Sequence, residues 1–192
     1  MNKSIVISRR DLIKNVLPTL KTGDVILCAN KSIIVWFMKK FQDDPVHWGH
    51  CLIVKDKDVA WEAFWTIREY SLSKFFKNKV YWRIARKKDI SEDNRANMLM
   101  IVPPLLGRFY GLRRILLQAL DHIFKTNRFS SSYKNVYDQV CSSFCSWIYE
   151  TSCGYRFNDV PWMSCDPDDI EDDWEKNPDS WEILEERLDE RE

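Results

Sequence analysis

Residues 48–65 have the sequence WGHCLIVKDKDVAWEAFW, in which two apolar runs are separated by the charged segment 55–58. Short runs that are rich in Val, Ile and Trp and end at a polar turn are typical of β-strands. Two such runs with a short polar connection predict an antiparallel hairpin. The hairpin carries one histidine, His50, and one acid outside its turn, Glu62.

The register of this hairpin decides whether His50 and Glu62 can interact. Direct pairing of these two positions would place their Cβ atoms about 4.5–5.5 Å apart on one face. A four-residue loop that pairs position 54 with 59 would instead put them on opposite faces, because side chains alternate along a strand. An interaction between His50 and Glu62 therefore requires a three- or five-residue loop.

The segments on either side of the hairpin predict an α+β fold, a small and mostly antiparallel sheet flanked by helices. One domain is expected over residues 1–192, with an N-terminal helix within residues 1–20 and an acidic helical tail at 170–192. The expected strands are residues 25–29, 48–54, 59–65 and 79–85, and the expected helices are residues 8–20, 32–41, 91–102, 112–124 and 141–152.

Composition and charge limit the classes of function. The chain is 45% hydrophobic and 14% aromatic, which is typical of a globular protein. It contains five glycines and neither GxGxxG nor GxxxxGK[ST], which argues against a glycine-rich phosphate loop. The net charge is zero, but residues 166–192 hold fourteen acids and three bases, so residues 1–165 carry +11. We expect the acidic tail to neutralise this basic body. No aromatic-basic motif supports a nucleic-acid partner.

No segment of the sequence predicts export or membrane insertion. The N-terminal segment lacks the apolar core and cleavage site of a signal peptide, and the longest apolar run elsewhere, residues 33–38, is too short for a membrane span. We therefore expect a cytoplasmic protein without a transmembrane segment. Its six cysteines are expected to be reduced thiols, and the absence of a CxxC pair argues against a zinc ribbon.

Cys141 stands where a helix is predicted to begin. Free backbone N–H groups and the helix dipole at such a position favour a thiolate, and the same N–H groups can bind an oxyanion. A small buried core residue is the other interpretation of Cys141, as it is for Cys145 one turn later, and position alone leaves both open for Cys141. For Cys145, among apolar neighbours, core packing is favoured.

The sequence offers few bases for such a nucleophile. It contains three histidines, and His50 lies on a predicted strand with Glu62 across the hairpin. His47 competes as the base, but it precedes the regular strand and fits a loop or the rim of a pocket better. His122 lies among apolar residues of a predicted helix and fits a structural role. A zinc site of His47, His50, Cys28 and Cys51 matches no known spacing, so no metal site is predicted.

Six short motifs together resemble the permuted NlpC-type papain-like cysteine hydrolases, in particular their YiiX-like branch. The resemblance covers about residues 16–184. The motifs occur in the family's order, as TGDVIL at 22–27, WGHCLIV at 48–54, AWEA at 60–63, GRFY at 107–110, VCSSF at 140–144 and PDDI at 167–170.

This resemblance implies a circularly permuted papain-like domain with a triad of Cys141, His50 and Glu62, acting without a cofactor or metal. It also implies substrate contacts at Asp24, Trp48 and Tyr110. The expected activity is that of an amidase or peptidase, a thiol protease in the broad sense, which cleaves an amide or related acyl bond through an acyl-enzyme. Its expected partner is a peptide-like or acylated small-molecule substrate.

Two alternatives remain open beside this activity. One is an acyltransferase or thioesterase of the lecithin retinol acyltransferase type, and the other is a non-catalytic binding module on the same fold. Aromatic side chains near the motifs could line an acyl pocket, although core packing is favoured. They are Trp36, Phe37, Trp48, Trp61 and Trp65.

Overall fold

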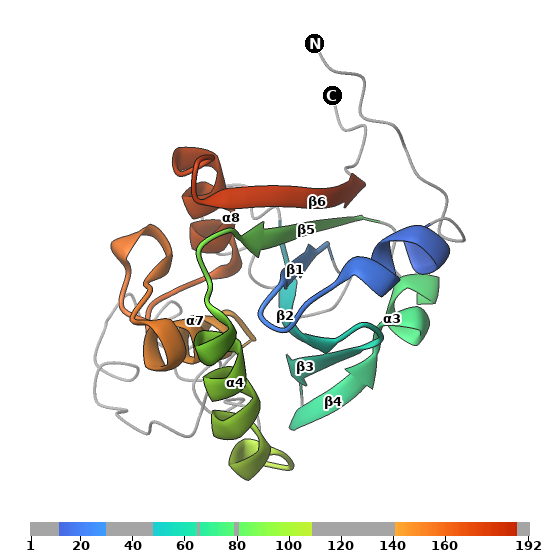
Figure 1. The fold of residues 1–192 in the computed structure, drawn as a ribbon, viewed down its shortest axis with the longest axis horizontal. Helices are drawn as coiled ribbons and strands as arrows, with labels where there is room; N and C mark the ends of the chain where they lie inside the picture. Colours follow the sequence, from blue (N-terminus) through green and yellow to red (C-terminus); the bar gives the residue numbers. More distant parts are fainter. Residues whose placement is uncertain (1–11, 30–47, 65, 79–80, 109–140, 188–192) are drawn as a thin grey trace, which may run out of the picture.

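The computed structural model describes residues 12–29, 48–64, 66–78, 81–108 and 141–187 (Figure 1). Its strands are β1 (Val25–Cys28), β2 (His50–Asp56), β3 (Val59–Ala63), β4 (Ile67–Ser71), β5 (Trp82–Lys87) and β6 (Trp181–Arg187). Its α-helices are α3 (Leu72–Asn78), α4 (Glu92–Ile101), α7 (Cys141–Cys153) and α8 (Pro167–Lys176). Short helical turns are η1 (Leu12–Val16), η2 (Leu17–Thr19), η3 (Pro103–Leu105) and η4 (Phe157–Asp159).

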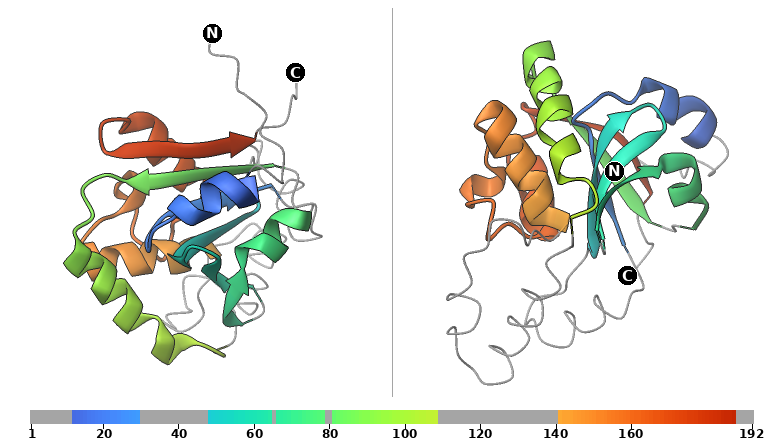
Figure 2. Two further views of the ribbon diagram at one scale, coloured as in Figure 1. Left: turned by 45° about the vertical axis from the view of Figure 1, so that its right-hand side comes forward. Right: turned by 90° about the horizontal axis from the view of Figure 1, so that it is seen from below.

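The six strands form one sheet in the order β4-β3-β2-β1-β5-β6, and every neighbouring pair is antiparallel. Helices α4, α7 and α8 cover one face of this sheet, while α3 and the turns η1 and η2 cover the other (Figure 2). The α+β prediction of an antiparallel sheet flanked by helices is therefore confirmed. The sheet has two strands more than were predicted, β4 and β6.

Alternating side chains of the central strands build two separate apolar cores. In β1, Val25 and Leu27 pack toward α7, whereas Ile26 and Cys28 pack toward α3 and the N-terminal turns. All four side chains are buried. A strand that is covered on both faces needs apolar residues at every position, which is why β1 is a continuous apolar run.

The register of the β2–β3 hairpin puts His50 and Glu62 on one face of the sheet, but it does not pair these two residues directly. Ile53 pairs with Trp61 and Val54 with Ala60, and a bulge then brings Asp56 opposite Val59. Residues 55–59 thus form the five-residue connection between Val54 and its partner. Continued along β2, this register sets Glu62 opposite position 52. The expected direct pairing of positions 50 and 62 is wrong by two residues, yet both side chains stay on one face.

The acidic tail is helical only in its first half. Helix α8 is followed by the edge strand β6, so the prediction of a helical tail over 170–192 is wrong for residues 181–187. A helix there would leave the outer edge of β5 unpaired, and the acids of β6 complement its basic residues. Arg83 pairs with Glu186 and Arg86 with Glu182 across the two strands. The expected neutralisation of a basic body by the tail takes place inside the sheet.

Several predicted elements have the expected bounds, and others do not. Helix α4 begins after the N-cap Ser91 and stops before two prolines, and α7 ends at Gly154 with its positive φ. The N-terminal segment forms the short turns η1 and η2 instead of one regular helix, because Pro18 interrupts the backbone hydrogen bonds. The helices expected at 32–41 and 112–124 lie outside the described residues.

The turn before β1 fixes how β1 and β2 align. The Gly23 N–H donates to the Val54 carbonyl at 2.9 Å, and the Val54 N–H donates to the Asp24 carbonyl at 2.8 Å. Gly23 has a φ of +92°, and a Cβ there would lie 3.0 Å from the sulfur of Met98. The turn thus requires glycine, and it sets the register that pairs Cys28 with His50.

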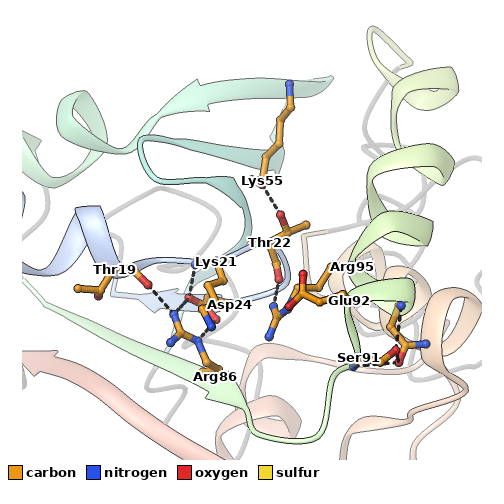
Figure 3. Close-up of polar contacts among 10 residues, drawn as sticks. Thr19, Lys21, Thr22, Asp24, Lys55, Arg86, Ser91, Glu92 and Arg95 are labelled. Carbon is orange, nitrogen blue, oxygen red and sulfur yellow. Dashed lines mark hydrogen bonds and ion pairs between the residues drawn. The ribbon is translucent and has the colours of Figure 1, made fainter.

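Asp24 is fully buried in an ion pair with Arg86 (Figure 3). The Arg86 Nε donates to one carboxylate oxygen at 2.8 Å and its Nη2 to the other at 2.7 Å. The Lys21 N–H also donates to Asp24 at 2.8 Å, and Arg86 Nη2 reaches the Thr19 carbonyl at 2.8 Å. These contacts occupy both oxygens of Asp24. The carboxylate holds the turn in place, and the expected substrate contact at Asp24 stays a prediction.

Replacing Asp24 by alanine is expected to lower the free energy of unfolding by about 3 kcal/mol, because it leaves the Arg86 guanidinium half-buried without its carboxylate. Urea denaturation followed by circular dichroism measures this. The matched control is Lys55→Gln, which removes the exposed Lys55–Glu69 ion pair and should cost at most about 1 kcal/mol. Equal losses in the two variants would contradict the structural role of Asp24.

Candidate active site

Three elements bring the predicted triad residues together at one end of the sheet. His50 is the first residue of β2, Glu62 lies in β3, and Cys141 is the first residue of α7. The helix α7 packs on the β2 face that contains Cys51 and Ile53. Both β2 and α7 begin at this end, and His50 and Cys141 act on each other electrostatically there, since each shifts the pKa of the other.

The His50 ring is held by Glu62. The distance between His50 Nε2 and Glu62 Oε1 is 2.9 Å, and the two side chains are 5% and 6% exposed. The ring of Phe64 lies edge-on to the imidazole, with centroids 6.0 Å apart. Because the carboxylate engages Nε2, Nδ1 is the ring nitrogen that can serve a nucleophile. A histidine that is oriented in this way by an acid is suited to act as the partner of a nucleophile.

Arg68 in β4 holds the other oxygen of Glu62. Its Nε donates to Glu62 Oε2 at 2.8 Å, and its Nη2 lies 2.7 Å from the same oxygen. The two residues are direct partners across β3 and β4. The guanidinium also lies over the ring of Tyr70, 4.8 Å from its centroid. Sequence analysis missed Arg68, because the strand that carries it was not predicted.

The electrostatics of the site favour a charge-separated pair. A hydrogen bond from Cys51 and the charge of His50 hold the pKa of Cys141 well below its ordinary value, although burial opposes them. Burial alone would lower the pKa of His50, but the charge and hydrogen bonds of Cys141 and Glu62 outweigh it and raise this pKa to about 9. Both shifts favour the thiolate form of Cys141 and the imidazolium form of His50.

Glu62 is ionised in this arrangement. Burial alone would raise the pKa of its carboxyl, but the hydrogen bonds and charges of His50 and Arg68 together lower it below its ordinary value. Cys141 is the first residue of α7, whose first turn contains no acid, and the free N–H groups and dipole at a helix start favour a thiolate.

Two further thiols lie beside the nucleophile candidate. Cys51 follows His50 in β2 and points to the opposite face, as its alternation predicted, and its sulfur is 3.4 Å from that of Cys145. Cys145 is fully buried in the core between α7 and the sheet, which confirms the interpretation as a packing residue. The side chain of Cys51 also helps to lower the pKa of Cys141.

Other residues predicted near the site have different surroundings. Trp48 and Trp61 are buried in the core that contains α7, so the core interpretation is confirmed for both. The Trp48 N–H donates to Asp168 at 3.3 Å, which ties the start of β2 to α8. Three candidates lie outside the described residues, namely His47, Tyr110 and His122. The aromatic residues Trp36, Phe37 and Trp65 lie outside them as well.

Within the described ranges, no three His, Cys, Asp or Glu side chains are arranged so that they could hold a metal ion. None of the helices in the described part of the chain is long and apolar enough to cross a membrane.

The sheet order and the helices on both faces define the class of fold, an antiparallel α+β domain of the YiiX-like kind. The chain is similar to the crystal structure of the metalloprotein YiiX from Escherichia coli O157:H7, with a TM-score of 0.62 and 13% sequence identity. The similarity covers 88% of this chain and 98% of that one. No protein-family model and no curated protein sequence matches the chain.

Proposed function

We propose that the protein is a cysteine hydrolase that cleaves an amide or related acyl bond, with Cys141 as nucleophile and His50 as acid and base. The observation that carries this proposal is the buried His50–Glu62 hydrogen bond on a ring that also contacts Cys141. A nucleophile, a base in contact with it and an acid that orients the base form the arrangement that nucleophilic catalysis requires.

The first half of the proposed reaction forms an acyl-enzyme. The Cys141 thiolate attacks the carbonyl carbon, and the oxyanion that develops lies near the free N–H groups at the start of α7. The His50 imidazolium then gives its proton to the leaving amine, and the carbon–nitrogen bond breaks. The acyl group stays on Cys141 as a thioester, and His50 is left neutral.

The second half restores the enzyme. Neutral His50 accepts a proton from water, the resulting hydroxide attacks the thioester, and the Cys141 thiolate leaves with its charge stabilised by the new imidazolium. Glu62 keeps Nδ1 of His50 directed at the sulfur during both halves, and Arg68 keeps Glu62 ionised. In both halves the proton moves to and from His50, whose contacts with Glu62 favour the protonated ring.

The chain order of these residues supports a circularly permuted papain-like arrangement. In papain-like enzymes the nucleophile stands near the mature N-terminus, and the histidine follows far downstream. Here His50 and Glu62 precede Cys141. The proposed substrate is a peptide-like amide or an acylated small molecule. The acyltransferase alternative gains no support from Trp48 and Trp61, because both pack in the core.

The pH dependence of two probe substrates tests the proposal. Hydrolysis of a short-chain acyl p-nitroanilide is expected to fall as the pH rises through about 9, because His50 then loses the proton that the leaving amine needs. The matching p-nitrophenyl ester needs no such proton, since its leaving group is a stable phenolate, and its rate should not fall there.

The ester thus serves as the control for general damage at high pH. An anilide rate that keeps rising above pH 9, or that falls near the ordinary histidine pKa of about 6.5, would contradict the assigned role of His50. Initial rates at saturating and at low substrate separate effects on the complex from effects on the free enzyme.

A further inference from the structure

The carboxylate of Glu62 is shared between two basic side chains, one at each oxygen. His50 Nε2 lies 2.9 Å from Oε1, while Nε and Nη2 of Arg68 lie 2.8 and 2.7 Å from Oε2. The side chains of His50 and Glu62 are 5% and 6% exposed, whereas that of Arg68 is 43% exposed. The three side chains therefore form a row from the buried imidazole to a guanidinium that reaches solvent.

The guanidinium of Arg68 is itself held in place. Arg68 in β4 is the direct cross-strand partner of Glu62 in β3. Its guanidinium carbon lies 4.8 Å from the ring centroid of Tyr70 and 5.5 Å from that of Phe64. An arginine that stacks on aromatic rings keeps its planar set of donors in a fixed direction. Because both oxygens of Glu62 are engaged, its carboxylate cannot turn without losing one of its two partners.

The charges around His50 change during the proposed reaction. Before acylation, the site favours a Cys141 thiolate beside a His50 imidazolium. In the acyl-enzyme the sulfur is a neutral thioester, and His50 must be neutral to accept a proton from water. The Glu62 carboxylate is then the charge next to the ring, and a buried carboxylate without a counter-charge favours the protonated imidazole. The guanidinium of Arg68 supplies this counter-charge.

We propose that Arg68 is a positioning residue for deacylation, which fixes Glu62 against His50 and balances its charge so that the imidazole can be neutral in the acyl-enzyme. This inference rests on the proposed function, because Arg68 acts through the same histidine. Neutral His50 takes one proton from water, the hydroxide oxygen bonds to the thioester carbon, and the carbon–sulfur bond breaks with its electron pair on the sulfur. Two titratable groups shift the pKa of His50, Cys141 of α7 and Glu62 of β3, and Arg68 of β4 acts on Glu62.

An NMR titration of His50 in Cys141→Ala tests the charge balance without any need for activity, because this variant lacks the thiolate as the acyl-enzyme does. The chain has three histidines, so the signal that disappears in His50→Ala is assigned directly. Adding Arg68→Met should raise the pKa of His50 by about half a unit or more, since water screens part of the charge of a half-exposed guanidinium. Arg68→Lys keeps the charge and should leave this pKa near its parent value, whereas Glu62→Gln should lower it.

Turnover of the p-nitrophenyl ester tests the effect on the reaction. Acylation by this ester needs no proton from His50, and a burst of p-nitrophenol shows that deacylation limits the rate. In Arg68→Met, kcat near pH 6 should fall by about tenfold, and the acid limb of kcat should move upward with the pKa of His50. Arg68→Lys should recover most of the rate.

Glu69→Gln is the matched control in the same strand. Glu69 follows Arg68 in β4, points to the other face of the sheet and forms an exposed ion pair with Lys55 at 2.8 Å. Its substitution should leave both the pKa of His50 and the ester rate unchanged. Circular dichroism establishes that each variant is folded, and Arg68→Gln replaces Arg68→Met if the methionine variant does not fold.

The two measurements separate this inference from the proposed function. An unchanged pKa of His50 in Arg68→Met, or a decrease like that in Glu62→Gln, overturns the inference. Equal losses of kcat in Arg68→Lys and Arg68→Met without a move of the acid limb also overturn it, because they would report packing alone. If Cys141→Ala hydrolyses the ester as fast as the wild type, the proposed function fails, and the titration still decides whether Arg68 balances the charge of Glu62.

Discussion

Replacing Cys141 by alanine is expected to lower the hydrolysis of an acyl p-nitroanilide by about 10⁴-fold or more, to the level of the reaction without a nucleophile. The substitution removes the one sulfur that the site activates through His50, Cys51 and the start of α7. It removes little volume from the core, so the fold should persist. Initial rates, together with thermal unfolding, measure both effects.

Cys153→Ala is the matched control for this loss. Cys153 ends the same helix and is more exposed than Cys141, but its sulfur contacts the Tyr149 carbonyl at 3.0 Å and lies at the other end of α7, about 18 Å from Cys141 along the helix. Full activity in Cys153→Ala with none in Cys141→Ala would agree with our assignment. Activity within tenfold of wild type in Cys141→Ala would contradict it.

Replacing His50 by alanine is the second large change, with an expected loss of about 10³-fold or more in anilide hydrolysis. The variant loses both the charge that stabilises the thiolate and the acid for the leaving amine. The midpoint of the pH profile for alkylation of Cys141 by iodoacetamide should also rise, since the charge of His50 helps to lower the pKa of Cys141. Anilide rates and the alkylation profile measure the two effects separately.

The variant Glu62→Gln is expected to lose less activity than His50→Ala, and it tests how Glu62 supports His50. The amide preserves the size of the side chain and removes the charge that favours the imidazolium, so the loss should be smaller than in His50→Ala. The alkaline limb of the anilide profile should move below about 9 in this variant, because the charge of Glu62 helps to raise the pKa of His50. Equal activity of wild type and His50→Ala would contradict the role of His50.

The sequence was sufficient to bring His50 and Glu62 together. A single acid in one apolar strand and a single histidine in the preceding strand predicted that the two side chains lie on the same face of the sheet. The observed register places them on the same face. The direct pairing was wrong because five residues, 55–59, connect Val54 to its partner Ala60, and this connection includes a bulge before Asp56. The position of a bulge depends on twist and on neighbouring strands, and residues 55–58 carry no local signal for it.

The residues that sequence analysis missed or misjudged depend on partners far away in the chain. Arg68 lies in a short strand with only one buried side chain, Ile67, so there is little apolar alternation to reveal the strand. The tail strand β6 is rich in acids, and its pairing with the basic strand β5 became visible only in the fold. Asp24 was expected to contact substrate, whereas Arg86, 62 positions later, encloses it in an ion pair.

The catalytic roles of Cys141, His50 and Glu62 remain a prediction, although the structure brings the three side chains into contact. The packing of Cys51 against α7 adds a feature that no motif in the sequence indicated. It follows from the alternation of β2, which directs His50 to one face and Cys51 to the other.

The mass of the protein during turnover of the p-nitrophenyl ester tests the central claim most directly. Rapid acid quenching followed by peptide mass spectrometry should find the acyl group on the peptide that contains Cys141, as a thioester that hydroxylamine removes. The label should be absent from Cys141→Ala and present in Cys153→Ala. Turnover of the ester without a label on Cys141, or with the acyl group on another residue, would contradict the account.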